Sequence, residues 1–178
     1  MTDAQAIGAS LLEPERFALV FDRHFDAIHA YVQRRVGPDL ADEIAAETFT
    51  RAFDQRRRYD GSRDDARPWL LGISANLLRR HWRSERRRLD AYARSSGHDA
   101  SEATAALAGE LAAALRRLPR REREPLLLLA WAELSYEEIA VALAIPVGTV
   151  RSRISRARGR LRGPNLDSHR PQEAPNNG

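Results

Sequence analysis

The stretch SYEEIAVALAIPVGTVRSRISRARGRLR, residues 135–162, predicts two helices joined by a tight turn. Ser135 followed by Glu138 is a capping box, in which each side chain satisfies a backbone N–H group that the first helical turn leaves open. The first helix is therefore expected to begin at about Ser135. In the turn sequence AIPVG, the proline ends that helix and the glycine lets the backbone bend closely.

The second helix of this stretch separates apolar residues from basic ones. Its apolar residues recur at steps of four, three and four and form one inward-facing stripe, which consists of Val150, Ile154, Ala157 and Leu161. Arginines and serines that can donate to phosphates and base edges occupy the other side: Arg151, Ser152, Arg153, Ser155, Arg156 and Arg158. Residues 147–162 include six arginines and no acid. The combination favours a DNA-binding helix-turn-helix over a solvated basic helix.

Composition limits the class of protein. A chain of 178 residues is long enough for one large or two small domains with cores of their own. It contains no cysteine, which excludes disulfides and thiolate metal sites and suits a reducing compartment. The N-terminal residues have neither the basic start of a signal peptide nor an apolar run of membrane length. We therefore expect a cytoplasmic protein without membrane insertion, with Ser10 in a mobile leader.

Charge is segregated along the chain. The net charge of +4 combines positive segments at residues 51–94 and 147–162 with negative segments at residues 1–50 and 95–146. The chain has no lysine, so its basic side chains other than histidine are guanidinium groups, which make bidentate and stacking contacts. Two positive segments suggest two separate contacts with a polyanion, and such contacts weaken as the salt concentration rises.

Apolar periodicity predicts helices along most of the chain and requires no strand. Besides the two helices above, the pattern predicts helices at residues 15–36, 39–53, 68–88, 110–118 and 121–131. Gly37 and Pro38 separate the first two of these, and Asp39 can cap the second. Residues 56–67 lack an apolar period and are expected to form a loop.

These helices predict an all-α fold with two small helical domains. The first domain covers residues 15–88 and the second residues 110–162. Residues 89–109 are rich in Ala, Ser and Gly and are expected to be a flexible, partly helical linker. Residues 163–178 are expected to be a disordered tail.

The predicted helix after Pro68 has a stripe suited to single-stranded nucleic acid. Unstacked bases need a flat surface, hydrogen bonds to their edges and positive charge near the backbone. The residues of the stripe are spaced three or four apart: Trp69, Ile73, Asn76, Arg80 and Arg83. Leu70, Leu77 and His81 occupy a face that can be buried. Taken alone, the spacing of Trp69 favours a core position for its ring, and the nucleic-acid role stays open.

Taken together, these segments resemble a bacterial RNA polymerase sigma factor of the sigma-70 family, in its extracytoplasmic-function (ECF) group. The resemblance covers about residues 17–162, and its motifs occur in the order that the family has. They are DLADEIAAETFTRAF at residues 39–53, WLLGISANLLRRHWR at residues 69–83, and LRRLPRREREPLLL followed by the helix-turn-helix. The first domain then resembles sigma region two and the second sigma region four.

The resemblance implies roles for individual residues. Contacts with the clamp of the largest polymerase subunit fall on Asp42, Glu43, Ile44, Glu47 and Phe49. Contacts with the minus-ten promoter element fall on Trp69, Asn76, Arg79, Arg80 and Arg83, and the loop at residues 59–67 is expected to hold an extruded base. Contacts with the minus-thirty-five element fall on Arg151, Ser152, Arg153, Ser155 and Arg156. Ala46 stands where many relatives have glutamine, which weakens one polar contact with the clamp.

The partners implied by the resemblance are core RNA polymerase and promoter DNA, both duplex and single-stranded, with an anti-sigma factor as in many relatives. No cofactor is implied, and the expected location is the cytoplasm, at the nucleoid within the holoenzyme. Two other classes of protein also carry a helix-turn-helix. An autonomous helix-turn-helix repressor or activator would protect its DNA site without polymerase. A DNA-acting enzyme would need a nucleophile with a supporting cluster, a phosphate loop or a metal-ligand spacing, and the sequence shows none.

Overall fold

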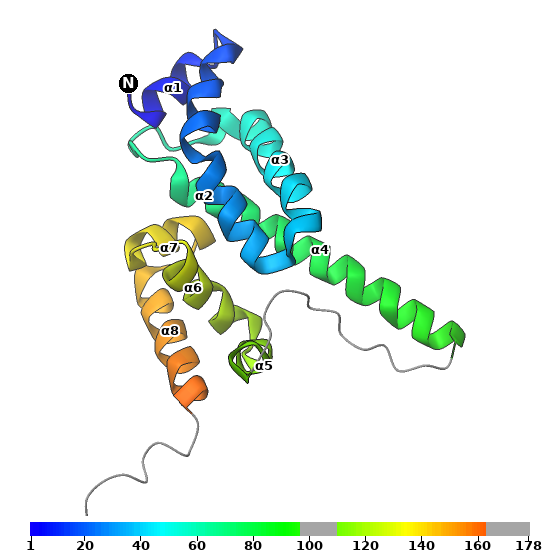
Figure 1. The fold of residues 1–178 in the computed structure, drawn as a ribbon. Coiled ribbons are helices and arrows are strands. Elements are labelled where there is room, and N and C mark those ends of the chain that lie inside the picture. The colour runs from blue at the N-terminus through cyan, green and yellow to red at the C-terminus, as the bar shows by residue number, and fades with distance from the viewer. Residues whose placement is uncertain (97–109, 163–178) are drawn as a thin grey trace, which may run out of the picture.

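The computed structural model describes residues 1–96 and 110–162, and within these ranges the regular structure is helical (Figure 1). The helices are α1 Asp3–Ala9, α2 Ala18–Val36, α3 Pro38–Gln55, α4 Arg67–Ser96, α5 Glu110–Arg117, α6 Arg120–Trp131, α7 Tyr136–Leu143 and α8 Val147–Arg162, with short 3₁₀ turns at Pro14–Phe17 and Arg56–Arg58. The predicted all-α class is confirmed. Residues 89–96 of the predicted linker belong to α4, whereas residues 97–109 and the predicted tail lie outside the described residues. None of the described helices has the length and apolar character to cross a membrane.

The N-terminal domain is built on three helices, α2, α3 and α4, each of which packs against the other two. Gly37 joins α2 to α3 with a positive φ of 82°, a conformation that costs glycine little. Its N–H donates to the Gln33 carbonyl oxygen at 2.8 Å, which closes the end of α2. Pro38 then occupies the first position of α3, so Asp39 lies in the first turn and is not the cap that the sequence suggested.

The segment before α2 is ordered, which corrects the expectation of a mobile leader. Thr2 and Gln5 form a capping box at the start of α1, with hydrogen bonds of 2.9 and 3.3 Å. Ala6, Ile7 and Ser10 are buried, and α1 packs against α2. A helix of seven residues is marginal by itself, so these tertiary contacts stabilise it.

The C-terminal domain packs α6, α7 and α8 around one apolar core. The Ser135–Glu138 capping box is present, with hydrogen bonds of 2.7 and 3.2 Å, and the predicted stripe on α8 is buried at Val150, Ile154 and Ala157. The turn differs from the expectation for its glycine. The residue in the left-handed conformation is Ala144, with φ 51° and ψ 49°, whereas Gly148 lies in the first turn of α8.

The two domains pack against each other, with α7 on α4 and α6 beside α2 (Figure 1). At Gly72 the α4 backbone comes close to α7, because a Cβ atom built there would lie 2.3 Å from the backbone oxygen of Ala142. Arg67 donates to the Ala132 carbonyl oxygen, and Arg34 donates to that of Trp131 at 3.3 Å. In this conformation the two domains are therefore held together by direct contacts as well as by their connection along the chain.

Candidate polymerase and nucleic-acid interfaces

The exposed side of α3 carries acidic side chains. Asp42 has 88% of its side chain exposed and accepts from Nε2 of His29 at 2.9 Å. Glu43 is exposed, and Glu47 is partly exposed and accepts from Nε of Arg51 at 2.6 Å. The side chains of Asp42, Glu43 and Glu47 form what we call the acidic face, which can attract a basic partner surface. Ala46 is exposed on the same helix and adds no polar group.

Two of the residues expected to touch the polymerase clamp are buried. Ile44 is 8% exposed and Phe49 is 4% exposed, and both belong to the core. The Phe49 ring packs edge-on against the Phe21 ring of α2, with 4.8 Å between their centroids. Neither side chain is at the surface in this conformation, and the contact of these two residues with the clamp stays a prediction. Both apolar side chains belong to the hydrophobic core, and Phe49 packs there against α2.

Four of the five residues expected at the minus-ten element offer polar groups along one side of α4. Asn76, Arg79, Arg80 and Arg83 are exposed, and Nη2 of Arg79 donates to Oδ1 of Asn76 at 2.7 Å. This bond holds the amide of Asn76 in one orientation. The Asn76 N–H groups remain available for a base edge.

Trp69 lies between a core position and an exposed position that could contact nucleic acid, the two possibilities that its spacing left open. Its ring is half-buried against the core, and its centroid lies 5.0 Å from that of the Tyr59 ring. Ile73, which the spacing placed on the same exposed stripe, is 7% exposed. The stripe is interrupted at Ile73, because α2, α3 and α7 pack against this part of α4. Leu70 and Leu77, on the face that the sequence allowed to be buried, are buried as well. Pairing with another domain cannot be read from one helix's periodicity.

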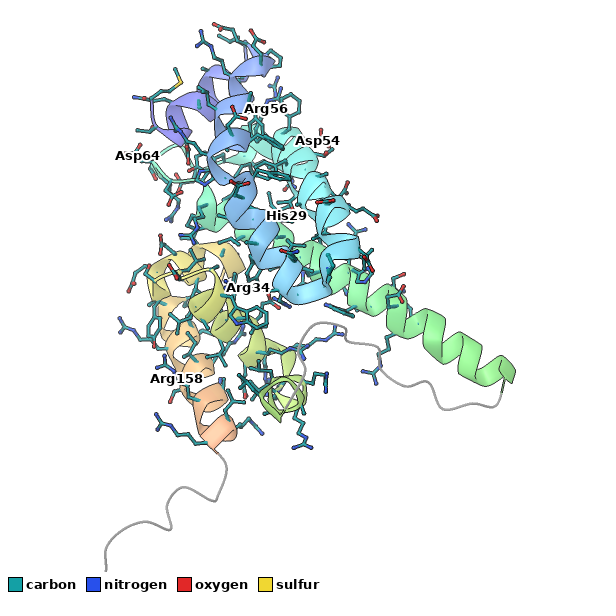
Figure 2. The ribbon with its side chains drawn as sticks, viewed as in Figure 1. His29, Arg34, Asp54, Arg56, Asp64 and Arg158 are labelled. Atoms are coloured by element: carbon teal, nitrogen blue, oxygen red, sulfur yellow. The ribbon has the colours of Figure 1, made fainter. Side chains whose placement is uncertain are left out.

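The five residues expected at the minus-thirty-five element are on α8. Arg151, Ser152, Ser155 and Arg156 are exposed, Arg153 is half-buried, and Arg158 extends into solvent (Figure 2). Nε of Arg156 lies 3.6 Å from Glu122 Oε1, and Oγ of Ser152 donates to the Thr149 carbonyl oxygen at 3.0 Å.

Glu122 of α6 is a buried carboxylate that sequence reasoning missed. It is 1% exposed, and its Oε2 lies 2.9 Å from Nε of Arg160, off the axis of a hydrogen bond, so the contact is an ion pair. A lone acid within the arginine-rich run RREREP gives no periodic sign that it faces α8. Because a buried charge is costly without a partner, Glu122 anchors the arginine-bearing side of α8 to α6.

Across the domain boundary, α2 and α6 share a second buried charge cluster. Arg35 donates from Nη1 and Nη2 to the two oxygens of Glu124 at 2.7 and 3.1 Å, and Tyr31 donates its hydroxyl to Glu124 at 3.0 Å. The Arg35 side chain is 7% exposed and that of Glu124 is 22% exposed. Burial alone would raise the pKa of Glu124, but Arg35 and the Tyr31 hydroxyl outweigh it and lower that pKa. This Arg35–Glu124 pair therefore stays ionised at neutral pH and couples the domains.

Comparisons with known proteins agree with these helices. Residues 20–88 match the family model of sigma-70 region 2, and residues 108–161 match that of sigma-70 region 4. The ECF RNA polymerase sigma factor EcfG of Rhodopseudomonas palustris is 34% identical over 128 residues, which are 69% of this chain and 70% of that protein. The ECF sigma factor SigC of Mycobacterium tuberculosis is 34% identical over 134 residues, which are 68% of each chain.

Among solved structures, CnrH in complex with the cytosolic domain of CnrY has the same fold. The match has a TM-score of 0.65 and 24% identity, and covers 90% of this chain and 94% of that one. The chain belongs to the ECF group of sigma-70 family RNA polymerase sigma factors. It is therefore a transcription initiation factor and not an enzyme.

Proposed function

We propose that this chain binds core RNA polymerase through the acidic face of α3 and directs it to promoters. In this proposal α4 and the loop before it read the minus-ten element, and α8 reads the minus-thirty-five element. The observation that carries the proposal is the separation of chemistry among exposed helix faces: carboxylates on α3 and guanidinium groups on α4 and α8. The first suits a basic protein surface, and the others suit two stretches of DNA.

Strand separation follows from the chemistry of α4. Unpairing a base costs on the order of a few kcal/mol, and capture of the extruded base offsets that cost. The amide of Asn76 and the half-buried ring of Trp69 offer an edge and a flat surface for this purpose. No nucleotide hydrolysis is required, because recognition itself supplies the free energy.

The closed arrangement of the domains must open for both elements to be read together. Both α4 and α8 pack against α7, and packed helices are about 8–10 Å apart, so the two reading helices lie within about 20 Å of each other there. Promoter elements about 25 base pairs apart are separated by roughly 85 Å of duplex. We therefore expect the Arg35–Glu124 pair and the α4–α7 contact to break when the holoenzyme binds a promoter.

An anti-sigma protein is a further expected partner. The RpoE structure from Bartonella quintana was solved with the anti-sigma factor NepR. For this chain we propose that such a protein would compete with polymerase for the acidic face.

Reconstitution with purified core polymerase on a library with randomised promoter elements tests the proposal. We expect start sites that share two sequence elements, and little transcription without the chain. Asn76→Ala should slow promoter opening more than it weakens closed-complex binding, whereas Gln33→Ala, at an exposed position of α2, should change neither. Equal loss in both assays would contradict the role of Asn76. A footprint on duplex DNA by the chain alone, with no affinity for core polymerase, would favour an autonomous regulator.

A further inference from the structure

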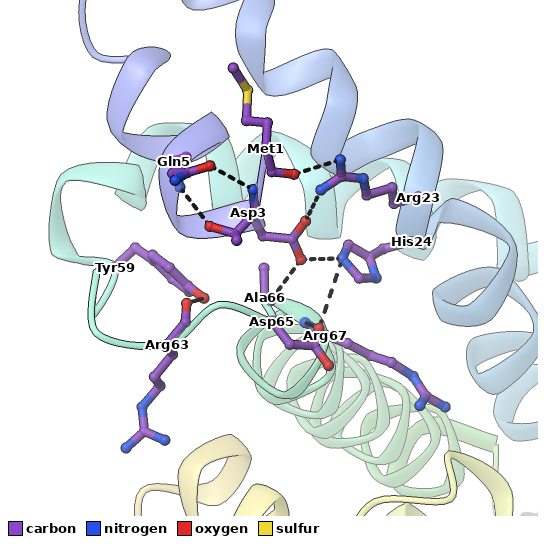
Figure 3. Close-up of polar contacts among 11 residues, drawn as sticks. Met1, Asp3, Gln5, Arg23, His24, Tyr59, Arg63, Asp65, Ala66 and Arg67 are labelled. Carbon is purple, nitrogen blue, oxygen red and sulfur yellow. Dashed lines mark hydrogen bonds and ion pairs between the residues drawn. The ribbon is translucent and has the colours of Figure 1, made fainter.

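Asp3 of α1 is a buried carboxylate surrounded by hydrogen-bond donors (Figure 3). Its side chain is 5% exposed, and its Oδ1 accepts from Nη1 of Arg23 at 2.8 Å. Its Oδ2 accepts from the N–H of Ala66 at 2.9 Å and from Nε2 of His24 at 2.6 Å. The N–H of Asp3 donates to the Asp64 carbonyl oxygen at 3.1 Å. One residue of α1 thus joins the loop before α4 to α2.

The loop at residues 59–66 is held at its other end by its own side chains. The hydroxyl of Tyr59 donates to the Arg63 carbonyl oxygen at 2.6 Å, and the Tyr59 ring packs on Trp69. Asp60 accepts from the N–H of Ser62 at 3.1 Å, which forms a local turn. These contacts shape the first half of the loop. Asp3 makes two hydrogen bonds to the loop backbone, one through its own N–H and one through its carboxylate. They set the position of the second half of the loop, up to buried Ala66 just before α4.

The partners of the Asp3 carboxyl stabilise its charged form. Burial would raise the pKa of the Asp3 carboxyl, but the Ala66 N–H, His24 and Arg23 outweigh it and lower that pKa. A buried carboxylate that faces several donors is an anchor for backbone, because its charge strengthens each bond. Asp65 also lies close, with Oδ1 3.9 Å from His24 Nε2, but the Arg23 guanidinium and the Ala66 N–H aimed at Asp3 oppose a cation there.

We propose that Asp3 is a positioning residue for promoter base selection. It fixes the backbone of the 59–66 loop relative to Trp69 and α4. A base extruded from the minus-ten element then meets the loop in one fixed position. This inference rests on the proposed function. It assigns a part in recognition to α1, which lies before the residues that match the region 2 model.

The test uses holoenzyme formed with the full chain and a promoter that the unsubstituted protein selects from the randomised library. Each minus-ten position is changed to the other three bases in turn, and the rate of strand opening is measured for each template. Asp3→Ala should reduce the preference for the favoured base at one position about tenfold, since it removes the charge-assisted bond between the Ala66 N–H and the Asp3 carboxylate. Preferences at the other positions and affinity for core polymerase should change little.

Two further variants separate positioning from stability. Arg23→Gln removes the partly exposed Oδ1 partner of Asp3 and leaves the Ala66 bond, so its base preference should stay normal. Asp3→Asn keeps one acceptor oxygen and the volume of the side chain, so it should recover part of the preference. If Asp3→Ala fails to fold, Asp3→Asn decides by the same measurement, with a partial loss expected at the same single position.

A uniform loss at every position, or an equal loss in Arg23→Gln, would overturn the proposal. Unchanged base preference in folded Asp3→Ala would do the same. If the unsubstituted holoenzyme itself shows no base preference in the minus-ten element, the proposed function fails instead, and that result is seen before any variant is made.

Discussion

Replacing Glu124 with alanine should open the two domains. The substitution leaves the Arg35 guanidinium, whose side chain is 7% exposed, in the interface without its carboxylate and removes the acceptor of the Tyr31 hydroxyl. Breaking a buried ion pair on one side costs about 3–5 kcal/mol, and the 22% exposure of the Glu124 side chain places the cost near the lower end. A cost of about 3 kcal/mol shifts the ratio of closed to open molecules by roughly a hundredfold.

The absence of cysteine makes the measurement direct, because two cysteines can be introduced and spin-labelled without background. Asp26 on α2 and Gly159 on α8 are exposed positions in the two domains. In the otherwise unsubstituted chain the distance between labels should be short and narrowly distributed. In Glu124→Ala it should become longer and broader, because a larger share of the molecules is then open.

Two comparisons show whether the pair itself is responsible. Arg51→Gln breaks the exposed Arg51–Glu47 pair within α3 and should leave the distances unchanged. The double variant Arg35→Met with Glu124→Leu removes both charges together and should restore much of the closed population. An unchanged distance distribution in Glu124→Ala would refute the reasoning that this pair holds the domains together.

Three further predictions concern pH, packing and the buried acid of α6. The pKa of Glu124 is lowered from its ordinary value of 4.5, so the contribution of Glu124 to closure should be full above pH 4.5. That contribution should be lost as the pH falls below 4.5, and the same label distances would report the loss. Gly72→Ala should push α7 away from α4, since the new Cβ would lie 2.3 Å from the oxygen of Ala142, although alanine favours the helix by about 1 kcal/mol; unchanged distances would contradict this. Glu122→Gln should destabilise the C-terminal domain by about 1–3 kcal/mol in urea unfolding, because Arg160 loses its buried partner, and full stability would show that the ion pair is dispensable.

Much of the local structure could be predicted from neighbouring residues. The Ser135–Glu138 capping box, the buried stripe of α8 and the break at Gly37 each depend on groups within about one helical turn, so spacing was sufficient. Spacing failed where the partner is distant in sequence. Ile73 was expected on an exposed stripe, but packing from other helices buries it.

The N-terminal helix shows the same limit. Its residues give a weak signal in isolation, and α1 forms because Ala6 and Ile7 are buried and because Asp3 meets donors from α2 and from the loop before α4. Groups that converge from three segments leave no periodic trace in the chain.

The sequence by itself determined that α2 to α8 are helical, where two arginine-rich surfaces and one acidic surface arise, and which family the motifs resemble. Helix period, capping and charge are properties of short segments. Tertiary structure alone decided which predicted contact residues are buried, that Asp3 anchors the 59–66 loop, and that Gly72 and the Arg35–Glu124 pair close one domain on the other. The physical reason is that burial and ion pairing depend on which atoms approach one another after folding, and residues far apart in sequence make those approaches.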